Sequence, residues 1–164
     1  MSTTPTPASS TATGIVITRA TLAELDLVAP LFDAYRVFYA QPSDPARARA
    51  FIGERLQHGQ SVVLLARDHD GRAAGFTQLY PLYSSVRTLK LWILNDLYVD
   101  AQARRGGVAS ALLAAAADFA RDDGAARLEL ETAHDNHAAQ ALYRARGWTT
   151  CDDSLRFQLA LAPA

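Results

Sequence analysis

The chain has 164 residues, 49% of them hydrophobic, which indicates one ordinary globular domain that folds without disulfides. Sixteen basic and 17 acidic residues give a formal net charge of -1, and this balance argues against a general nucleic-acid-binding protein. No apolar run approaches the roughly 20 residues of a membrane-spanning helix. The single cysteine, Cys151, allows no internal disulfide, favours a reducing compartment such as the cytoplasm, and is expected to be buried.

The N-terminal segment and the shortage of lysine each carry a further expectation. Residues 1–14 contain no charged side chain and no large apolar one beyond Met1, so we expect a disordered tail followed by one domain over residues 15–164. Lys90 is the only lysine among 16 basic residues and alanine is abundant, which suggests a GC-rich, bacterial genome.

The first part of the domain predicts one strand and two helices. A strand is expected at residues 15–19, and Thr21 with Glu24 forms a capping box at the start of a long helix. One face of that helix carries Leu25, Val28, Leu31, Phe32, Tyr35, Phe38 and Tyr39. A second helix is expected over residues 44–56.

Strands dominate the middle of the chain. Residues 61–67 and 73–80 read as two strands joined by a turn that contains Asp70-Gly71. A longer strand is expected over residues 89–99, followed by a helix over residues 106–120.

The last part alternates strand and helix. Residues 126–131 alternate apolar and charged side chains, as a strand with two unlike faces does. A short helix is expected over residues 138–146, and residues 148–151 and 155–161 are expected to form a final hairpin. The element order predicts an α/β (α+β) domain with a mostly antiparallel sheet and one strand–helix–strand crossover.

The most informative segment is the turn between the strand at 89–99 and the next helix. It is rich in arginine and glycine and reads Arg104-Arg105-Gly106-Gly107-Val108-Ala109-Ser110. Glycines let the backbone approach a ligand closely, and a helix N-terminus offers unpaired N–H groups to an anion. The segment therefore indicates a pyrophosphate site, although a plain turn with solvated arginines has the same local pattern. Neither a Walker-type loop nor the dinucleotide fingerprint G-x-G-x-x-G is present.

Two motifs make the sequence resemble the GNAT superfamily of acyl-CoA-dependent N-acyltransferases. The family's [QR]-x-x-G-x-[GA] motif matches the run from Arg104 to Ala109. Its second pattern, N-x-x-A-x-x-L-Y-x-x-x-G-[FW], matches Asn136, Ala139, Leu142, Tyr143, Gly147 and Trp148. The resemblance covers roughly residues 15 to 161. It implies a mixed, mostly antiparallel twisted sheet of six to seven strands, with splayed central strands and about four flanking helices.

The resemblance also implies acetyl-CoA as co-substrate and assigns residues to it. The strand end Leu97-Tyr98-Val99 is expected to pair with the pantetheine arm, and one of its N–H groups is expected to polarise the thioester carbonyl. The pyrophosphate is expected on Arg104, Arg105, Gly106, Gly107, Val108, Ala109 and Ser110. Asn136 is expected to bond the pantetheine, although a helix N-cap accounts for it equally simply.

Catalysis is expected to depend on two residues. Tyr143 matches the tyrosine that protonates the departing thiolate in the family, while its simplest structural role is that of an aromatic core residue. Asp96 is our candidate for orienting the amine and accepting its proton, and a structural carboxylate is an equal alternative. Tyr35 and Tyr39 are expected to bind the substrate, as part of an aromatic wall for a cation drawn from Tyr35, Phe38, Tyr39, Tyr80, Tyr83 and Trp92.

The run Leu94-Asn95-Asp96-Leu97-Tyr98-Val99 resembles the small-amine branch of the family, although many polyamine members carry Glu where this chain has Asn95. We therefore expect transfer of an acetyl group to a primary amine of a small molecule. A protein lysine or N-terminal acetyltransferase and a non-catalytic CoA-binding sensor remain alternatives. His134 and His137 lack further ligands, so no metal is expected. Relatives often dimerise through their later strands, which suggests a homodimer. Neither a nucleic acid nor a membrane is expected as a partner.

Overall fold

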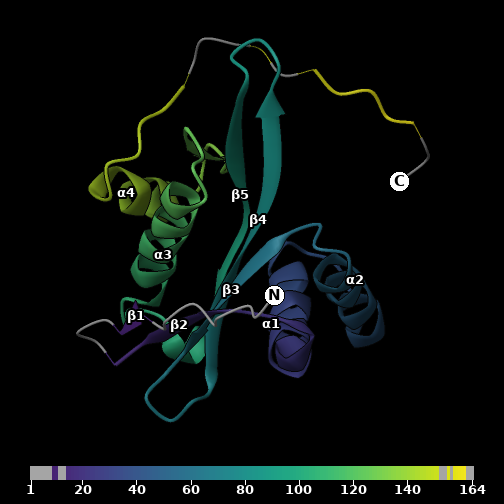
Figure 1. The fold of residues 1–164 in the computed structure, drawn as a ribbon. Helices are drawn as coiled ribbons and strands as arrows, with labels where there is room; N and C mark the ends of the chain where they lie inside the picture. Colours follow the sequence, from purple (N-terminus) through teal and green to yellow (C-terminus); the bar gives the residue numbers. More distant parts are fainter. Residues whose placement is uncertain (1–8, 11–13, 152–154, 156, 162–164) are drawn as a thin grey trace, which may run out of the picture. The chain divides into compact units, whose positions relative to one another are not determined.

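The computed structural model describes residues 9–10, 14–151, 155 and 157–161 (Figure 1). The chain divides into two compact units, residues 1–131 and residues 132–164. The first unit contains the sheet and three of the α-helices that the structure describes, and the second contains the fourth.

The described strands of the first unit form one sheet in chain order. They are β1 (Ser9–Ser10), β2 (Val16–Arg19), β3 (Val62–Arg67), β4 (Ala73–Ser84), β5 (Leu89–Val99) and β6 (Leu128–Leu130). Neighbours from β1 to β5 are antiparallel, whereas β5 and β6 are parallel. β6 pairs only with Trp92–Leu94, so β5 continues without it from residue 95 to its end at Val99. This is the splayed, mostly antiparallel sheet that the sequence predicts.

Helices lie on both faces of that sheet. After the 3-10 turn η1 (Leu22–Glu24), the helices α1 (Leu25–Phe38) and α2 (Pro45–Gln57) lie together on one side, and α3 (Val108–Asp122) lies on the other (Figure 1). On the α1–α2 side the core is formed by Val28, Leu31, Phe32, Ile52, Val63, Leu65 and Phe76. On α3 the buried residues include Leu112, Leu113 and Ala116, at the helical spacing that the sequence shows. No helix among the described residues is long and apolar enough to cross a membrane.

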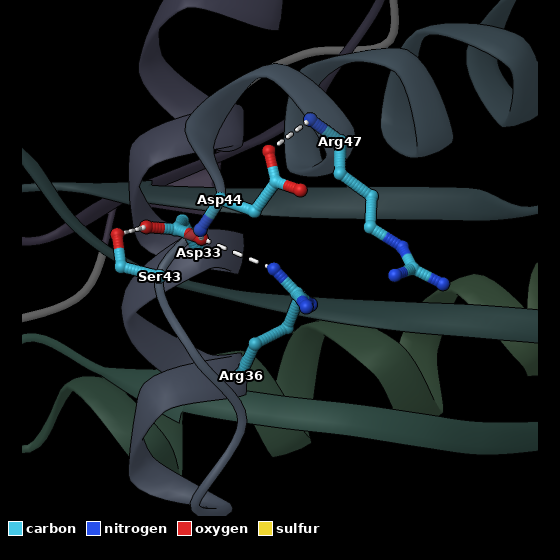
Figure 2. A network of polar contacts seen from close by, with 5 residues as sticks. All are labelled: Asp33, Arg36, Ser43, Asp44 and Arg47. Carbon is cyan, nitrogen blue, oxygen red and sulfur yellow. Dashed lines mark hydrogen bonds and ion pairs between the residues drawn. The ribbon is translucent and has the colours of Figure 1, made fainter. Parts of the chain in front are cut away.

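A polar network fixes the connection between α1 and α2 (Figure 2). Asp33 of α1 accepts hydrogen bonds from Ser43 Oγ at 2.6 Å and from the Asp44 N–H at 2.8 Å, and its Oδ1 pairs with Arg36 at 3.3 Å. Asp44 in turn caps α2 by accepting from the Arg47 N–H at 3.0 Å. One buried carboxylate thus sets where α2 begins relative to α1.

Three sequence expectations differ from the structure. Ser9 and Ser10, inside the expected disordered tail, form β1, because strand pairing uses backbone groups and needs no large side chain. The expected final hairpin has no strand in its described residues 148–151, 155 and 157–161, and its turn lies outside them. Cys151 is exposed rather than buried, because no strand there carries it into a core.

Candidate functional site

The turn after β5 places two arginines and a helix start together. Asp100 caps a short 3-10 turn, η2 (Ala101–Ala103), by accepting from the Gln102 N–H at 2.9 Å. The chain then passes through Arg105 with φ +63° and reaches Gly107, the N-cap of α3, with φ +81°. Left-handed torsions at two positions within three residues turn the backbone sharply into the helix.

The start of α3 has the features of an anion site. The Ala111 N–H donates to the Gly107 carbonyl at 3.0 Å, and no side chain caps the helix. In an α-helix the earlier N–H groups have no partner within the helix, and they lie at the positive end of its dipole. The side chains of Arg104 and Arg105 are exposed beside them, and Arg104 Nε donates to the Val99 carbonyl at 3.3 Å.

The end of β5 leads into that turn with one backbone edge beyond the reach of β6. Leu97, Tyr98 and Val99 pair with β4 on one side, whereas β6 ends its pairing at Leu94. β4 approaches β5 closely here, since a Cβ placed on Gly75 would lie 2.6 Å from the Tyr98 carbonyl oxygen. Only glycine allows this approach. The structure thus brings the predicted strand end and the predicted anion turn together in one segment.

A β-bulge just before this segment places Asp96. Gln78 pairs with Asp96 but the next residue of β4, Leu79, pairs with Leu94, so Asn95 is the extra residue. Asn95 is exposed, whereas Asp96 has 5% of its surface exposed. A bulge in a strand re-aims the side chains that follow it, and here it turns a charged side chain into the protein.

Neutral partners surround the Asp96 carboxylate. Gln78 Nε2 donates to Oδ2 at 2.6 Å, and Asn95 Nδ2 donates to Oδ1 at 3.0 Å. Burial raises the pKa of Asp96 above its ordinary value, and the hydrogen bonds of Gln78, Tyr35 and Asn95 only partly oppose that shift. A carboxyl group with a raised pKa is better matched to accepting a proton from an amine than an ordinary surface carboxylate.

Aromatic side chains lie on the same side as Asp96. The ring of Tyr35, in α1, packs edge-on against Phe76 of β4 and Tyr98 of β5, with centroids 5.9 and 6.3 Å away. Tyr39 packs edge-on against Tyr35 at 5.0 Å and is 54% exposed. The two tyrosines predicted to bind substrate therefore lie together, one next to the carboxylate and one toward solvent.

The other residues of the predicted aromatic wall do not all lie in one place. Phe38 packs against Tyr39 at 5.2 Å. Burial raises the pKa of Tyr80, and the nearby Asp96 charge raises it further. Trp92 instead packs on Phe119 of α3 and donates to Asp123 at 2.9 Å, and Tyr83 is 67% exposed on the β4–β5 hairpin. The sequence could not tell these groups apart, because helix and strand faces are not known before packing.

The second unit holds the other motif. Asn136 is the N-cap of α4 (His137–Ala145), and its side chain accepts from the Ala139 N–H at 3.2 Å. The capping alternative for Asn136 is therefore present in the structure. The ring of Tyr143 lies 6.1 Å from that of Trp148, and the Tyr143 carbonyl accepts from the Trp148 N–H at 3.1 Å. The L-Y-x-x-x-G-W pattern thus joins the last turn of α4 to the residue that follows Gly147. Gly147, with φ +82°, ends it.

The sequence analysis missed two residues of the first unit's site. Gln78 binds the Asp96 carboxylate, and Ser61 Oγ donates to Gln78 Oε1 at 2.8 Å. The available signal was a glutamine inside a largely apolar strand. Among the described residues, no group of three or more His, Cys, Asp or Glu side chains gathers at a possible metal position.

Comparison with known proteins agrees with this geometry. The family model described as Acetyltransferase (GNAT) family matches residues 28–148. An uncharacterized N-acetyltransferase YhfO of Bacillus subtilis (strain 168) is 45% identical over 132 residues, which are 80% of this chain and 88% of that protein. An aminoglycoside N(6')-acetyltransferase type 1 of Stenotrophomonas maltophilia is 27% identical over 116 residues, 69% of this chain and 76% of the relative.

A solved structure gives the same answer for the fold. The crystal structure of a probable acetyltransferase superposes with a TM-score of 0.85 at 42% identity, over 90% of this chain and 99% of the other. The family match spans both the anion turn and the L-Y-x-x-x-G-W pattern. The chain therefore belongs to the GNAT family and is an acetyl-CoA-dependent N-acetyltransferase.

Proposed function

We propose that this enzyme transfers the acetyl group of acetyl-CoA to a primary amine of a small molecule, by direct attack in a ternary complex. The observation that carries the proposal is the Asp96 carboxylate, buried on β5 between the amide of Gln78 and the aromatic Tyr35, just before the strand end that leads to the anion turn. A buried anion beside aromatic rings suits a small organic cation. The aminoglycoside acetyltransferase among the relatives supports a small-molecule amine.

Acetyl-CoA fits the residues of the turn. The uncapped start of α3 and the exposed side chains of Arg104 and Arg105 offer N–H groups and positive charge to its pyrophosphate, through the backbone of Gly106 to Ser110. The backbone of Leu97 to Val99, beyond the reach of β6, offers hydrogen bonds to the pantetheine amides and the thioester carbonyl. Asn136 is assigned to the pantetheine as well.

The proposed chemistry moves three protons. Asp96 holds the cationic amine and takes its first proton, directly or through water, to give the neutral amine. The neutral nitrogen forms the new bond to the thioester carbon as the carbon–sulfur bond breaks, and the acylated nitrogen loses its second proton to solvent water. Tyr143 gives a proton to the CoA thiolate and regains one from solvent, so one proton is released in each turnover. Because a thiol has a pKa near 8.5, its anion leaves readily, so the tyrosine helps moderately. Removing the amine proton is the harder task.

Release of the CoA thiol in the presence of acetyl-CoA and a panel of polyamines, amino acids and aminoglycosides tests the proposal. Turnover on at least one small amine is expected. Activity on peptides alone would make the enzyme a protein acetyltransferase, and CoA binding without any turnover would make it a sensor. Tyr143→Phe should lower kcat about 10-fold or less while the KM for acetyl-CoA stays near wild type. A large loss of acetyl-CoA affinity would contradict the acid role.

We also propose that the enzyme acts as a homodimer in the cytoplasm of a bacterium. Leu155, Phe157, Leu159 and Leu161 are each at least 80% exposed at alternate positions, a pattern that suits a strand covered by another surface. The cellular assignment has support from the single cysteine and from the bacterial relatives. Light scattering coupled to gel filtration would give the mass, and a monomer at micromolar concentration would rule out the dimer.

A further inference from the structure

Three buried polar side chains form a chain of hydrogen bonds that ends at Asp96. Ser61, directly before β3, donates from Oγ to Gln78 Oε1 at 2.8 Å. Gln78, in β4, donates from Nε2 to Asp96 Oδ2 at 2.6 Å. The exposed fractions of Ser61, Gln78 and Asp96 are 5%, 0% and 5%. These hydrogen bonds therefore run from the start of β3 across β4 to β5, almost entirely out of contact with water.

The donors and acceptors in this chain permit one direction only. An ionised carboxylate accepts hydrogen bonds and cannot donate them, so the amide must present its NH₂ group to Asp96. The amide oxygen then faces the other way and needs a donor, which the Ser61 hydroxyl supplies. Ser61 thus holds the amide in the orientation that binds a charged carboxylate.

The position of Gln78 would favour an apolar residue on packing grounds alone. Phe76 and Leu79, its neighbours in β4, are fully buried, and Thr77 is as well. A buried amide is unfavourable unless each polar atom is hydrogen-bonded, whereas an aliphatic side chain of similar size needs no partners. The amide is therefore explained by the carboxylate that it binds rather than by the core around it.

We infer that Gln78, itself oriented by Ser61, is a positioning residue that keeps the Asp96 carboxylate ionised and aimed at the acceptor amine. The inference rests on the proposed function of Asp96. A hydrogen bond to the charged form of an acid stabilises that form, which opposes the effect of burial at this site. Gln78 thereby lets a deeply buried carboxylate remain available as an anion.

The other groups around Asp96 come from four elements. Tyr35 of α1 hydrogen-bonds to the carboxylate, and Asn95 of β5 donates to it at 3.0 Å. The Asp96 charge contributes to the raised pKa of Tyr80 in β4. Arg55 of α2 hydrogen-bonds to Tyr80 and pairs with Glu54 at 2.9 Å. None of these contacts involves Gln78 or Ser61, so the variants below test the amide itself.

The test compares three variants of the full chain, Gln78→Met, Ser61→Ala and Thr77→Val. Methionine keeps the length of glutamine without its amide. Thr77 is the matched control, because its hydroxyl donates to the Asp96 backbone oxygen at 2.8 Å and not to the carboxylate. For each variant, kcat/KM for the best amine of the panel is measured against pH. The ionisation of the amine is the same in all variants, so a difference between profiles reports on the enzyme.

A second readout needs no activity. The carboxyl carbon of Asp96 is titrated by ¹³C NMR in aspartate-labelled protein, with the signal assigned from Asp96→Asn. Gln78→Met is expected to raise the Asp96 pKa and to move the acidic limb of the rate profile upward by about one pH unit. Ser61→Ala should move both in the same direction by less, and Thr77→Val should move neither.

The outcomes separate the inference from the proposed function. If Asp96→Asn keeps wild-type turnover and pH profile, the role of Asp96 is wrong and the inference about Gln78 is overturned with it. If Asp96→Asn is inactive but Gln78→Met keeps the wild-type pKa and profile, only the inference about Gln78 is overturned. A shift in Thr77→Val equal to that in Gln78→Met would show a general loss of packing, which also overturns it. Should Gln78→Met fail to fold, Ser61→Ala decides the question by the same two readouts.

Discussion

Asp33 and Asp96 are both buried aspartates of the first unit, with 8% and 5% of their surfaces exposed, yet their surroundings act in opposite directions. Asp33 accepts from the Ser43 hydroxyl and the Asp44 N–H and pairs with the Arg36 cation, and these contacts lower its pKa, the Ser43 bond most (Figure 2). Burial dominates at Asp96 and raises its pKa. Depth of burial alone therefore does not decide how a carboxylate behaves.

The difference lies in the partners. Asp33 has a cation, a hydroxyl and a backbone N–H, so its charge is compensated and its position is fixed for folding. Asp96 has an amide from each of two strands and a tyrosine, and among the described residues it forms no ion pair. A carboxylate whose charge is left uncompensated can still attract a cation from outside. Perturbed groups of this kind are typical of functional sites.

The largest expected difference between the two is in activity. Asp96→Asn should lower kcat/KM for the amine by roughly 10²- to 10⁴-fold, the usual contribution of a general base, because the amide cannot take a proton. Asp33→Asn, which changes a structural network, should stay within about 10-fold of wild type once folded. Initial rates of thiol release give both values. Equal losses in the two variants would remove the functional distinction.

The second difference is in stability at neutral pH, where Asp33→Asn should lower Tm by several degrees. The folded pKa of Asp33 is lowered, so its stabilisation is present above the unfolded pKa and is lost as pH falls through the folded value. The Tm gap between wild type and Asp33→Asn should therefore narrow in acid. Calorimetry from pH 7 down to about pH 3 measures this Tm gap. A gap that does not change with pH would show that the stabilisation does not come from the ionised Asp33 carboxylate.

Asp96→Asn should shift Tm in the opposite direction by a few degrees. The folded pKa of Asp96 is raised, so its favourable contribution is present below the unfolded pKa and is lost as pH rises through the folded value. Above that value wild type holds a buried charge that the asparagine lacks. The variant is therefore expected to be more stable than wild type at pH 7 and to match it in acid. A lower Tm at pH 7 would mean that the hydrogen bonds outweigh burial.

The smallest effect is expected for Ser43→Ala. It removes one of the hydrogen bonds to Asp33 but leaves the Asp44 N–H and Arg36 in place. Tm should fall by less than in Asp33→Asn, and turnover should be unchanged because the network holds the α1–α2 connection and not the substrate. A change in the amine KM without a change in Tm would show that the connection shapes the acceptor site directly.

Local sequence patterns predicted the elements well where side-chain periodicity is strong. The capping box of Thr21 and Glu24 is present in the structure, and α3 lies within two residues of the expected helix over residues 106–120. The anion turn was recognisable because glycine, arginine and a helix start are adjacent in the chain. The ends of the chain were predicted less well, since β1 uses backbone pairing alone and the apolar alternation of residues 155–161 requires a neighbouring strand that the described residues do not show.

The sequence by itself predicted the family, the order of the elements from β2 to α4 and a segment that suits a pyrophosphate, because these depend on residues close together in the chain. It also singled out Asp96, but could not choose between a structural and a catalytic carboxylate. The partners of that carboxylate depend on pairing across the sheet. Only the register of β4 and β5, with its bulge at Asn95, brings Gln78 to Asp96, and only the neighbouring strand brings Ser61 to Gln78. Hydrogen-bond partners 17 and 18 residues apart are a property of the folded sheet.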